Sequence, residues 1–448
     1  PRIADQRIGY FSEKVTDLST YDSNNARDLI NRWRLVKKDP DAELSEPEQP
    51  LVYWVENSTP EEIRPFVVKG IEAWNKAFEK AGFKNAIVAK IQPDDAEWDA
   101  GDVRYNVVRW ASTPSPRYSG YGPSVANPRT GEIIAADIVQ EFNAIKRGYT
   151  YRKLWGYTEE NDPLEQWIVS LTMHEVGHTL GLRHNFKSSW VYDAKEVHDV
   201  SITGDNHIGS VMDYDPINLA PEGIPQGNFF PTGPGFYDIW AIEFGYTPSF
   251  TDEERENLLS KSTQPEYIFG TDGDAMSSPG VNIDPRNYRG DMSNDPITYT
   301  SDRIKTLNAK IAELPEIFLT DGETSTEFRS NFYRLTTEKG RFLDGVSRLI
   351  GGVYSNRIVN DPNIEMTPFE AVPYEDQKRA MSLIKEQLLS NDAFSFDEKL
   401  LKYLQSEKRA AYSPRRGGNE DPQLHDLVLG LQGRAIAHIL HPVVMKRL

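Results

Sequence analysis

The sequence has no cysteine and comparatively little positive charge. Cysteine is absent from all 448 residues, which excludes disulfide frameworks, thiolate nucleophiles and cysteine-based zinc sites. Any bound metal must therefore be held by histidine, aspartate, glutamate or tyrosine. Lys and Arg together number 50 against 68 Asp and Glu, and the net charge of −18 repels phosphate backbones and anionic lipid. We therefore expect no nucleic-acid partner.

Long hydrophobic runs are also missing. No apolar stretch approaches the roughly 18 residues that a membrane-spanning helix needs, so we expect no transmembrane segment. The chain begins at Pro1 without a signal-like apolar stretch, and we expect it to be a trimmed piece of a longer precursor. Hydrophobic residues make up 38% and charged residues 26%, which excludes disordered and fibrous classes and indicates a globular protein.

The residue pattern changes near position 250. Upstream of it, strand-like alternation and amphipathic helical spacing succeed one another, whereas downstream the apolar spacing is mostly helical. The sequence therefore predicts an α+β fold in three parts. These are an N-terminal extension with strands over residues 1–50, a mixed β-sheet with helices over 51–250, and a mainly α-helical region over 251–448.

Helix caps and turn formers mark the elements of the first 250 residues. Thr59 and Glu62 form a capping box that predicts one long helix ending at Gly82, with an apolar face that lies across a sheet. A second helix is predicted over residues 164–180. Strands are predicted at residues 31–36, 51–55, 86–91, 103–110, 124–126 and 132–138, and the last two form a hairpin near a sheet edge.

Three of the eight histidines lie in the run His-Glu-Val-Gly-His-Thr-Leu-Gly-Leu-Arg-His that begins at residue 174. On a helix His174 and His178 are one turn apart, so both imidazoles can reach one ion. Glu175 lies beside them, where its carboxylate can contact a metal-bound water without binding the metal. Gly181 can take the left-handed conformation that ends the helix and lets His184 return to the same ion. This arrangement predicts a catalytic zinc site with three imidazole ligands.

Other interpretations of these residue types are weaker. Burying three imidazoles and a carboxylate in a core without an ion is costly, which disfavours a purely structural helix. A thermolysin-like site would take Glu196 or Asp199 as its third ligand, but the helix that this requires is only weakly indicated. His198 and His207 are ligands by type, yet the triad needs no further imidazole, and we interpret them as polar loop residues.

A methionine-bearing run, Ser-Val-Met-Asp-Tyr, follows at residues 210–214. Together with the extended histidine motif, it resembles the metzincin clan of zinc endopeptidases. The resemblance implies a twisted mixed β-sheet with a backing helix and an active-site helix, and it implies that Met212 forms a structural Met-turn beneath the zinc. Tyr214 resembles the tyrosine of astacin-like and serralysin-like members, which binds zinc weakly or stabilises the oxyanion.

A longer stretch, over about residues 1–246, resembles a bacterial family of large, exported, mostly uncharacterised zinc-dependent metalloproteases. The residues that carry it lie at 174–186, 204–209, 210–216 and 237–246. The resemblance implies a catalytic domain over 51–250 and a missing upstream domain, of which residues 1–50 are the remnant. It also implies an exported, periplasmic or cell-surface protein, which we expect to be a monomer.

The predicted function is that of a zinc-dependent endopeptidase. Water activated at zinc attacks the peptide bond, Glu175 acts as the general base, and Tyr214 assists. A peptide or protein substrate would pair with the hairpin over residues 124–138. Two alternatives stay open, because the histidine motif indicates how the attacking water is activated but not which type of bond it hydrolyses. One is a zinc-dependent amide hydrolase acting on a cell-wall or glycan-linked substrate, and the other is a non-catalytic zinc-binding surface module.

Some acidic residues and the remaining histidines invite further metal hypotheses. Calcium prefers several oxygen ligands, and the sequence offers candidates at Asp205, Asp213, Asp215, Asp272 and Asp274. Their spacing matches no defined calcium loop, and solvated turn residues are the simpler interpretation. In the helical region, His425, His438 and His441 are more typical of a helix surface or core than of a metal site.

Overall fold

The computed structural model divides the chain into two compact units. The first unit comprises residues 1–218, 226–272 and 356–367, and the second comprises 219–225, 273–355 and 368–448. The residues that the structure describes are 1–114, 116–275, 278–322, 324–359, 366–406 and 421–448. No helix in this described part is both long and apolar enough to cross a membrane. The predicted functional boundaries at residues 50 and 250 stay predictions.

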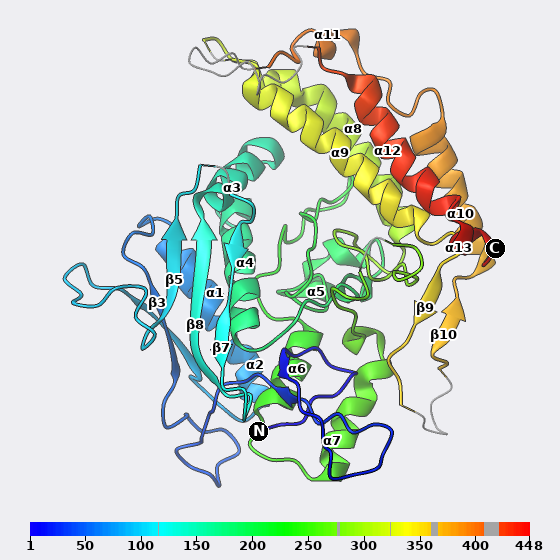
Figure 1. Cartoon of the computed structure of the whole chain (residues 1–448). Coiled ribbons are helices and arrows are strands. Elements are labelled where there is room, and N and C mark those ends of the chain that lie inside the picture. The colour runs from blue at the N-terminus through cyan, green and yellow to red at the C-terminus, as the bar shows by residue number, and fades with distance from the viewer. Residues whose placement is uncertain (115, 276–277, 323, 360–365, 407–420) are drawn as a thin grey trace. The chain divides into compact units, whose positions relative to one another are not determined.

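A six-stranded mixed sheet is the centre of the first unit (Figure 1). The order is β4-β3-β5-β8-β6, and β7 pairs with β8 as well. The first four strands of this order run parallel, whereas β6 and β7 run antiparallel to β8. The predicted hairpin is therefore present as β7 and β8. The strands are β3 (Leu51–Val55), β4 (Ile87–Ile91), β5 (Asn106–Ala111), β6 (Gly120–Tyr121), β7 (Ser124–Ala126) and β8 (Ile133–Glu141).

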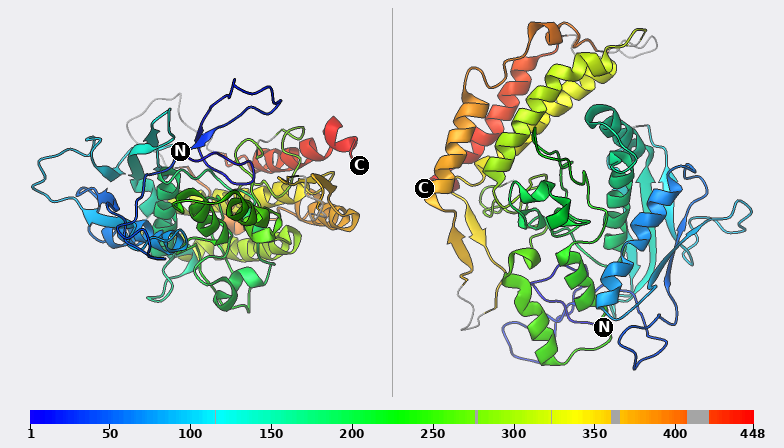
Figure 2. Two further views of the ribbon diagram at one scale, coloured as in Figure 1. Left: turned by 90° about the horizontal axis from the view of Figure 1, so that it is seen from below. Right: turned by 180° about the vertical axis from the view of Figure 1, so that it is seen from behind.

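Helices α1 (Arg64–Glu72) and α4 (Pro163–Thr179) pack against each other and against the sheet (Figure 2). This is the predicted α+β fold, with a backing helix and a helix that carries the histidine motif. Helix α4 begins where the Asp162 carboxylate accepts a hydrogen bond from the Leu164 N–H. The other helices of this unit are α2 (Asn75–Lys80), α3 (Phe142–Trp155), α5 (Val200–Thr203), α6 (Phe236–Tyr246) and α7 (Asp252–Leu259).

The predicted single helix ending at Gly82 is divided into α1 and α2, and two further local predictions in this unit are wrong. The capping box at Thr59 does not form: residues 60–63 make a turn that buries Ile63, and helix α1 starts only at Arg64 without a side-chain cap. The predicted strand over residues 31–36 is also absent, and Arg32 makes only an isolated bridge. The neighbouring residues pair instead as β1 (Ser12–Glu13) and β2 (Leu29–Ile30). In both places burial of side chains in the core overrides the local pattern.

Buried hydrogen bonds fix the second half of α4 within the core. The Trp74 indole N–H donates to the Met173 carbonyl at 3.0 Å, and the Trp33 indole N–H donates to the Thr179 carbonyl at 2.8 Å. The Tyr53 hydroxyl of β3 lies 2.7 Å from the Thr179 hydroxyl. These contacts pin the helix from several elements, so the side chains at its end have a defined position.

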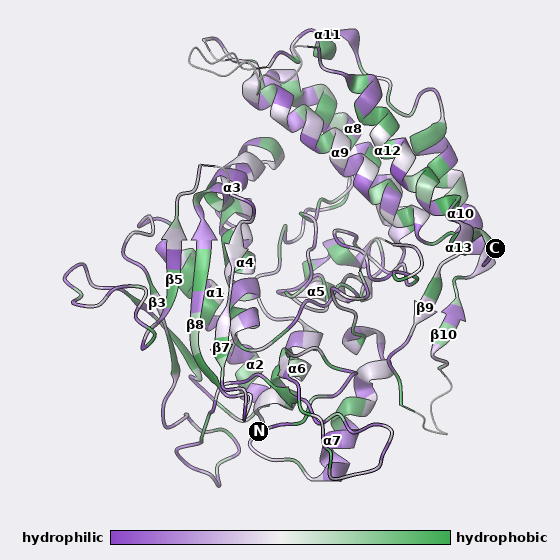
Figure 3. Cartoon of the chain, viewed as in Figure 1, coloured by the Kyte–Doolittle hydropathy of each residue, from purple (hydrophilic) through white to green (hydrophobic). Residues whose placement is uncertain are grey.

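The second unit is mainly helical, as predicted. Helix α8 (Pro296–Phe318) packs along α9 (Thr326–Ser347), which also contacts α10 (Tyr374–Ile384) and α12 (Leu424–Ile439). These helices carry alternating apolar and polar bands, as expected for helices with one buried face (Figure 3). The remaining elements are α11 (Glu398–Leu401), α13 (Pro442–Met445) and the hairpin of β9 (Val353–Ser355) and β10 (Phe369–Ala371).

Candidate active site

The three motif histidines meet at the C-terminal end of α4. His174 and His178 lie on its last two turns, and Gly181 turns the chain with φ +97° so that His184 comes back to them. One potential ligand atom from each imidazole lies within 4.8 Å of the others. A Cβ at Gly181 would lie 2.0 Å from the Asn31 carbonyl, so this position requires glycine for space as well as for conformation.

Each imidazole makes its hydrogen bond through Nδ1. The acceptors are the Val211 carbonyl at 2.7 Å for His174, the Leu182 carbonyl at 2.9 Å for His178, and the Asp272 carboxylate at 2.9 Å for His184. Because oxygen acceptors hold the proton on Nδ1, the lone pair of each ring lies on Nε2. Nε2 is therefore the atom that each ring can offer to a metal ion.

The electrostatics of the site favour the neutral form of His174 and His178. Burial, aided by the neighbouring rings, lowers the pKa of His174 well below its usual value and that of His178 to about 4. The Nε2 atom of His184 is buried without a hydrogen-bond partner. A set of three imidazole nitrogens, one of them buried and without a hydrogen-bond partner, fits the preference of zinc for imidazole ligands.

Glu175 is buried beside the triad, and burial raises the pKa of its carboxyl to about 8. Strand β6 passes close to it. A Cβ at Gly120 would lie 2.5 Å from the Glu175 Oε1, and a Cβ at Gly122 would lie 2.4 Å from the Glu175 carbonyl. Gly120 therefore lets the backbone of the sheet edge approach the carboxyl group of Glu175, and Gly122 lets it approach the backbone of the same residue.

The turn that carries Met212 is tied to the triad by its backbone and its side chain. Met212 is fully buried, and a Cβ on Gly177 of α4 would lie 2.3 Å from its sulfur. The buried Asp238 carboxylate accepts hydrogen bonds from the Ser210 hydroxyl and from the Val211 N–H at 2.8 Å. Burial raises the pKa of Asp238 to about 6. Asp238 therefore holds the same peptide segment whose carbonyl accepts from His174.

Tyr214 lies at the mouth of the site. Its ring centre is 4.6 Å from that of His184 and 5.3 Å from that of His174, and the side chain is 45% exposed. Tyr214, the three histidines and Glu175 line one cavity of about 640 Å³. Strand residues 120–124, Asp272 and an N-terminal group of Phe11, Ser12 and Asn31 complete its lining. The cavity has the size of a ligand cleft.

A sequence model of the family described as Met-zincin matches residues 158–448, well over half of the chain. The chain belongs to the Met-zincin family. The match includes the whole histidine motif, the Met212 turn and the helical region through Leu448. It does not include the strands of the sheet. No curated protein and no solved structure matches the chain.

The other candidate ligands of this Met-zincin lie elsewhere. Asp199 caps α5 through the Ser201 N–H, Glu196 accepts from the Asp193 N–H, and His207 lies 3.5 Å from Asp215. In the described parts of the chain, the only group of three or more His, Asp or Glu side chains close enough to share an ion is the histidine triad.

The five aspartates of the calcium hypothesis have separate partners where contacts are defined. Asp205 pairs with Lys76 at 2.9 Å, Asp213 accepts from the Ser188 hydroxyl and the Ser189 N–H, and Asp272 accepts from His184. Calcium binding stays a prediction.

Sequence reasoning missed several residues that shape this site. Asp272 entered only as a calcium candidate, and Asp238 only as part of a family-like stretch. No strand was predicted between residues 110 and 124, although Gly120 and Tyr121 form β6. The alternating glycines at 120 and 122 were the available signal, because glycine in a strand marks close backbone approach.

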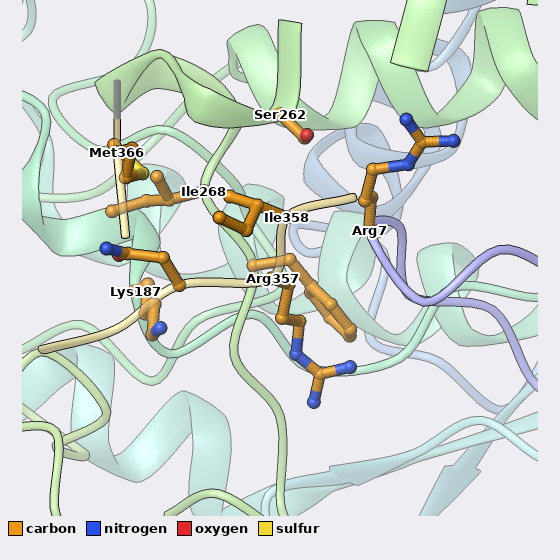
Figure 4. A pocket seen from close by; sticks show the side chains of 9 residues that line it. Arg7, Lys187, Ser262, Ile268, Arg357, Ile358 and Met366 are labelled. Atoms are coloured by element: carbon orange, nitrogen blue, oxygen red, sulfur yellow. The ribbon is translucent and has the colours of Figure 1, made fainter. Parts of the chain in front are cut away.

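A second cavity in the same unit is too small for a substrate. It measures about 10 Å³, room for one water, and both polar and apolar side chains line it, among them Arg7, Lys187 and Arg357 (Figure 4). The guanidinium groups of Arg7 and Arg357 point in different directions, and Arg7 pairs with Asp5 and Glu256. We therefore assign no substrate or ligand to this cavity.

Proposed function

We propose that this Met-zincin is a zinc-dependent endopeptidase. The observation that carries the proposal is that three imidazoles and the buried carboxyl group of Glu175 converge on one open cleft. A purely structural zinc site has no use for a carboxylate beside its ligands. The family membership supports the same conclusion, and the earlier resemblance supports an exported protein with its catalytic part over residues 51–250.

His174, His178 and His184 would hold the ion. The zinc ion would act as a Lewis acid: it would polarise the scissile carbonyl and lower the pKa of the attacking water. Glu175 would take the proton from the attacking water and return it to the leaving amine as the C–N bond breaks. The Tyr214 hydroxyl would donate a hydrogen bond to the oxygen that gains negative charge.

The edge of the sheet supports an extended peptide as substrate. Strands β6 and β7 lie on the outer side of β8, and residues 120–124 line the cleft above Glu175. A peptide backbone placed along this edge would bring a scissile carbonyl over the triad. The aromatic ring of Tyr121 is 56% exposed and is available for substrate side chains.

A comparison of two glutamate variants tests the proposal. In Glu175→Gln the zinc content should stay at one ion per chain while peptide cleavage falls by about 100-fold or more. Glu165→Gln is the matched control, since Glu165 lies on the same helix but pairs with Lys69 on the surface. Zinc loading is measured by metal analysis, and turnover by mass spectrometry of a peptide panel.

Each outcome of this comparison has a clear meaning. An active Glu175→Gln protein would refute the assigned base. Zinc-loaded wild-type protein that cleaves no peptide but releases amine from cell-wall or glycan-linked amides would establish the alternative substrate class. Loaded wild-type protein that is inert on both panels would favour a binding module.

A further inference from the structure

The N-terminal segment around Tyr10 runs beside the loop between the second and third histidines. Tyr10 forms an antiparallel bridge with Leu182. The Phe11 N–H donates to the Gly181 carbonyl at 2.8 Å, and the Arg183 N–H donates to the Gly9 carbonyl at 3.1 Å. A segment that is about 170 residues away in the chain is thus built onto the edge of the candidate zinc site as a short strand.

The segment is anchored rigidly in the core. The Tyr10 ring is buried and its hydroxyl donates to the Ala241 carbonyl at 2.6 Å. The Gly9 N–H donates to the Tyr237 hydroxyl at 2.7 Å, and a Cβ at Gly9 would overlap the Phe269 ring at 2.2 Å. Successive side chains of an extended segment point to opposite sides, so an inward Tyr10 directs Phe11 outward.

Phe11 faces the cleft. It is 40% exposed, it lines the 640 Å³ cavity, and its ring centre is 5.9 Å from the ring of His178. The guanidinium carbon of Arg183 lies 5.9 Å from the same ring and supports it. The rest of the lining combines polar side chains and glycine backbone with Pro123, Tyr121 and Tyr214. The exposed part of this ring is a fixed apolar surface beside a candidate ligand, and a substrate side chain in the cleft can cover it.

We propose that Phe11 is a specificity-determining residue, whose ring forms an apolar wall beside His178 and selects peptides with a large apolar side chain close to the scissile bond. This inference rests on the proposed endopeptidase function. Its physical basis is the removal of two apolar surfaces from water when such a side chain packs on the ring. Because Tyr10 anchors this segment in the core, the Phe11 backbone is already fixed, and substrate binding need not order it.

The test compares the zinc-loaded wild-type protein with Phe11→Ala, Phe11→Leu and Phe11→Trp. Leu18→Ala is the control, since Leu18 is 85% exposed and does not line the cavity. Cleavage of a mixed peptide library gives the side-chain preference at each position. Calorimetry with two peptide hydroxamates, identical except for a benzyl group or a hydrogen next to the hydroxamate, gives a binding measure that needs no turnover.

The expected result is selective. Phe11→Ala should lose about tenfold in kcat/KM for peptides with Phe or Leu at one position and about tenfold in affinity for the benzyl hydroxamate, while the hydrogen analogue changes little. Phe11→Leu should keep most of the preference, and Phe11→Trp should shift it toward smaller side chains.

Two other results would contradict the proposed role of Phe11. Equal losses on both hydroxamates would make Phe11 only a support for His178, and unchanged preferences in all three variants would overturn the proposal outright. If wild type binds the hydroxamates but cleaves no peptide, the endopeptidase function fails, and the hydroxamate pair still decides the role of Phe11.

Discussion

The Asp272 carboxylate accepts the Nδ1 proton of His184 at 2.9 Å, although the two residues are 88 positions apart in the chain. Phe186 and Gly270 join the same two stretches by a backbone hydrogen bond of 2.8 Å. The third histidine of the motif is therefore oriented by a segment that lies far downstream of the motif in the sequence. A negative acceptor also makes the opposite nitrogen more basic, which favours metal binding.

Removal of this carboxylate should weaken zinc binding. In Asp272→Ala the His184 ring loses its orienting partner, and we expect the zinc affinity to fall about 10- to 100-fold. Competition with a chromogenic chelator measures the dissociation constant. Asp205→Ala, which removes an exposed partner of Lys76, is the control. Equal affinities of Asp272→Ala and wild type would show that His184 needs no such support.

The buried Asp238 should give stability a specific pH dependence. Burial raises its pKa from 3.8 to about 6, although three hydrogen bonds to the carboxylate oppose this. Between these values the folded chain binds the proton and the unfolded chain does not, so the free energy of unfolding falls as pH rises. The stabilising contribution is complete below about pH 4, and it is lost above about pH 6, a change of about 3 kcal/mol.

Asp238→Asn isolates this contribution from the many other carboxylates. The stability of wild type relative to the variant should fall by up to about 3 kcal/mol between pH 4 and pH 7, because only wild type titrates at this position. Urea unfolding of both proteins with a chelator present gives the difference at each pH. A constant difference would mean that the hydrogen bonds to the carboxylate outweigh its burial.

Local spacing was sufficient to predict the parts of the site that lie on one element. His174, Glu175 and His178 share the last turns of one helix, and their proximity follows from helical geometry alone. The hairpin of β7 and β8 was predicted for a similar reason, since turn formers and strand alternation lie next to each other in the sequence. Helix α4 and the helices of the second unit followed from apolar periodicity.

Tertiary contacts determine the rest, and no local pattern encodes them. Asp272 and Asp238 are single aspartates among many, and their roles arise only when packing brings them to His184 and Val211. Phe11 reaches the cleft because residues 9–12 pair with the loop after α4. The failed capping box at Thr59 has the same cause, since burial of Ile63 outweighs a cap worth about 1 kcal/mol.

Replacement of Tyr214 by phenylalanine should separate the two roles that the resemblance leaves open. If the hydroxyl stabilises the oxyanion, Tyr214→Phe lowers kcat by about 100-fold and leaves KM and zinc affinity nearly unchanged. If the hydroxyl binds zinc, the dissociation constant of zinc rises as well. Tyr121→Phe, which changes another exposed tyrosine of the cleft, is the control. We expect the first outcome, because Tyr214 is 45% exposed at the mouth of the site and the three imidazoles alone could hold the ion. Full activity of Tyr214→Phe would exclude both roles.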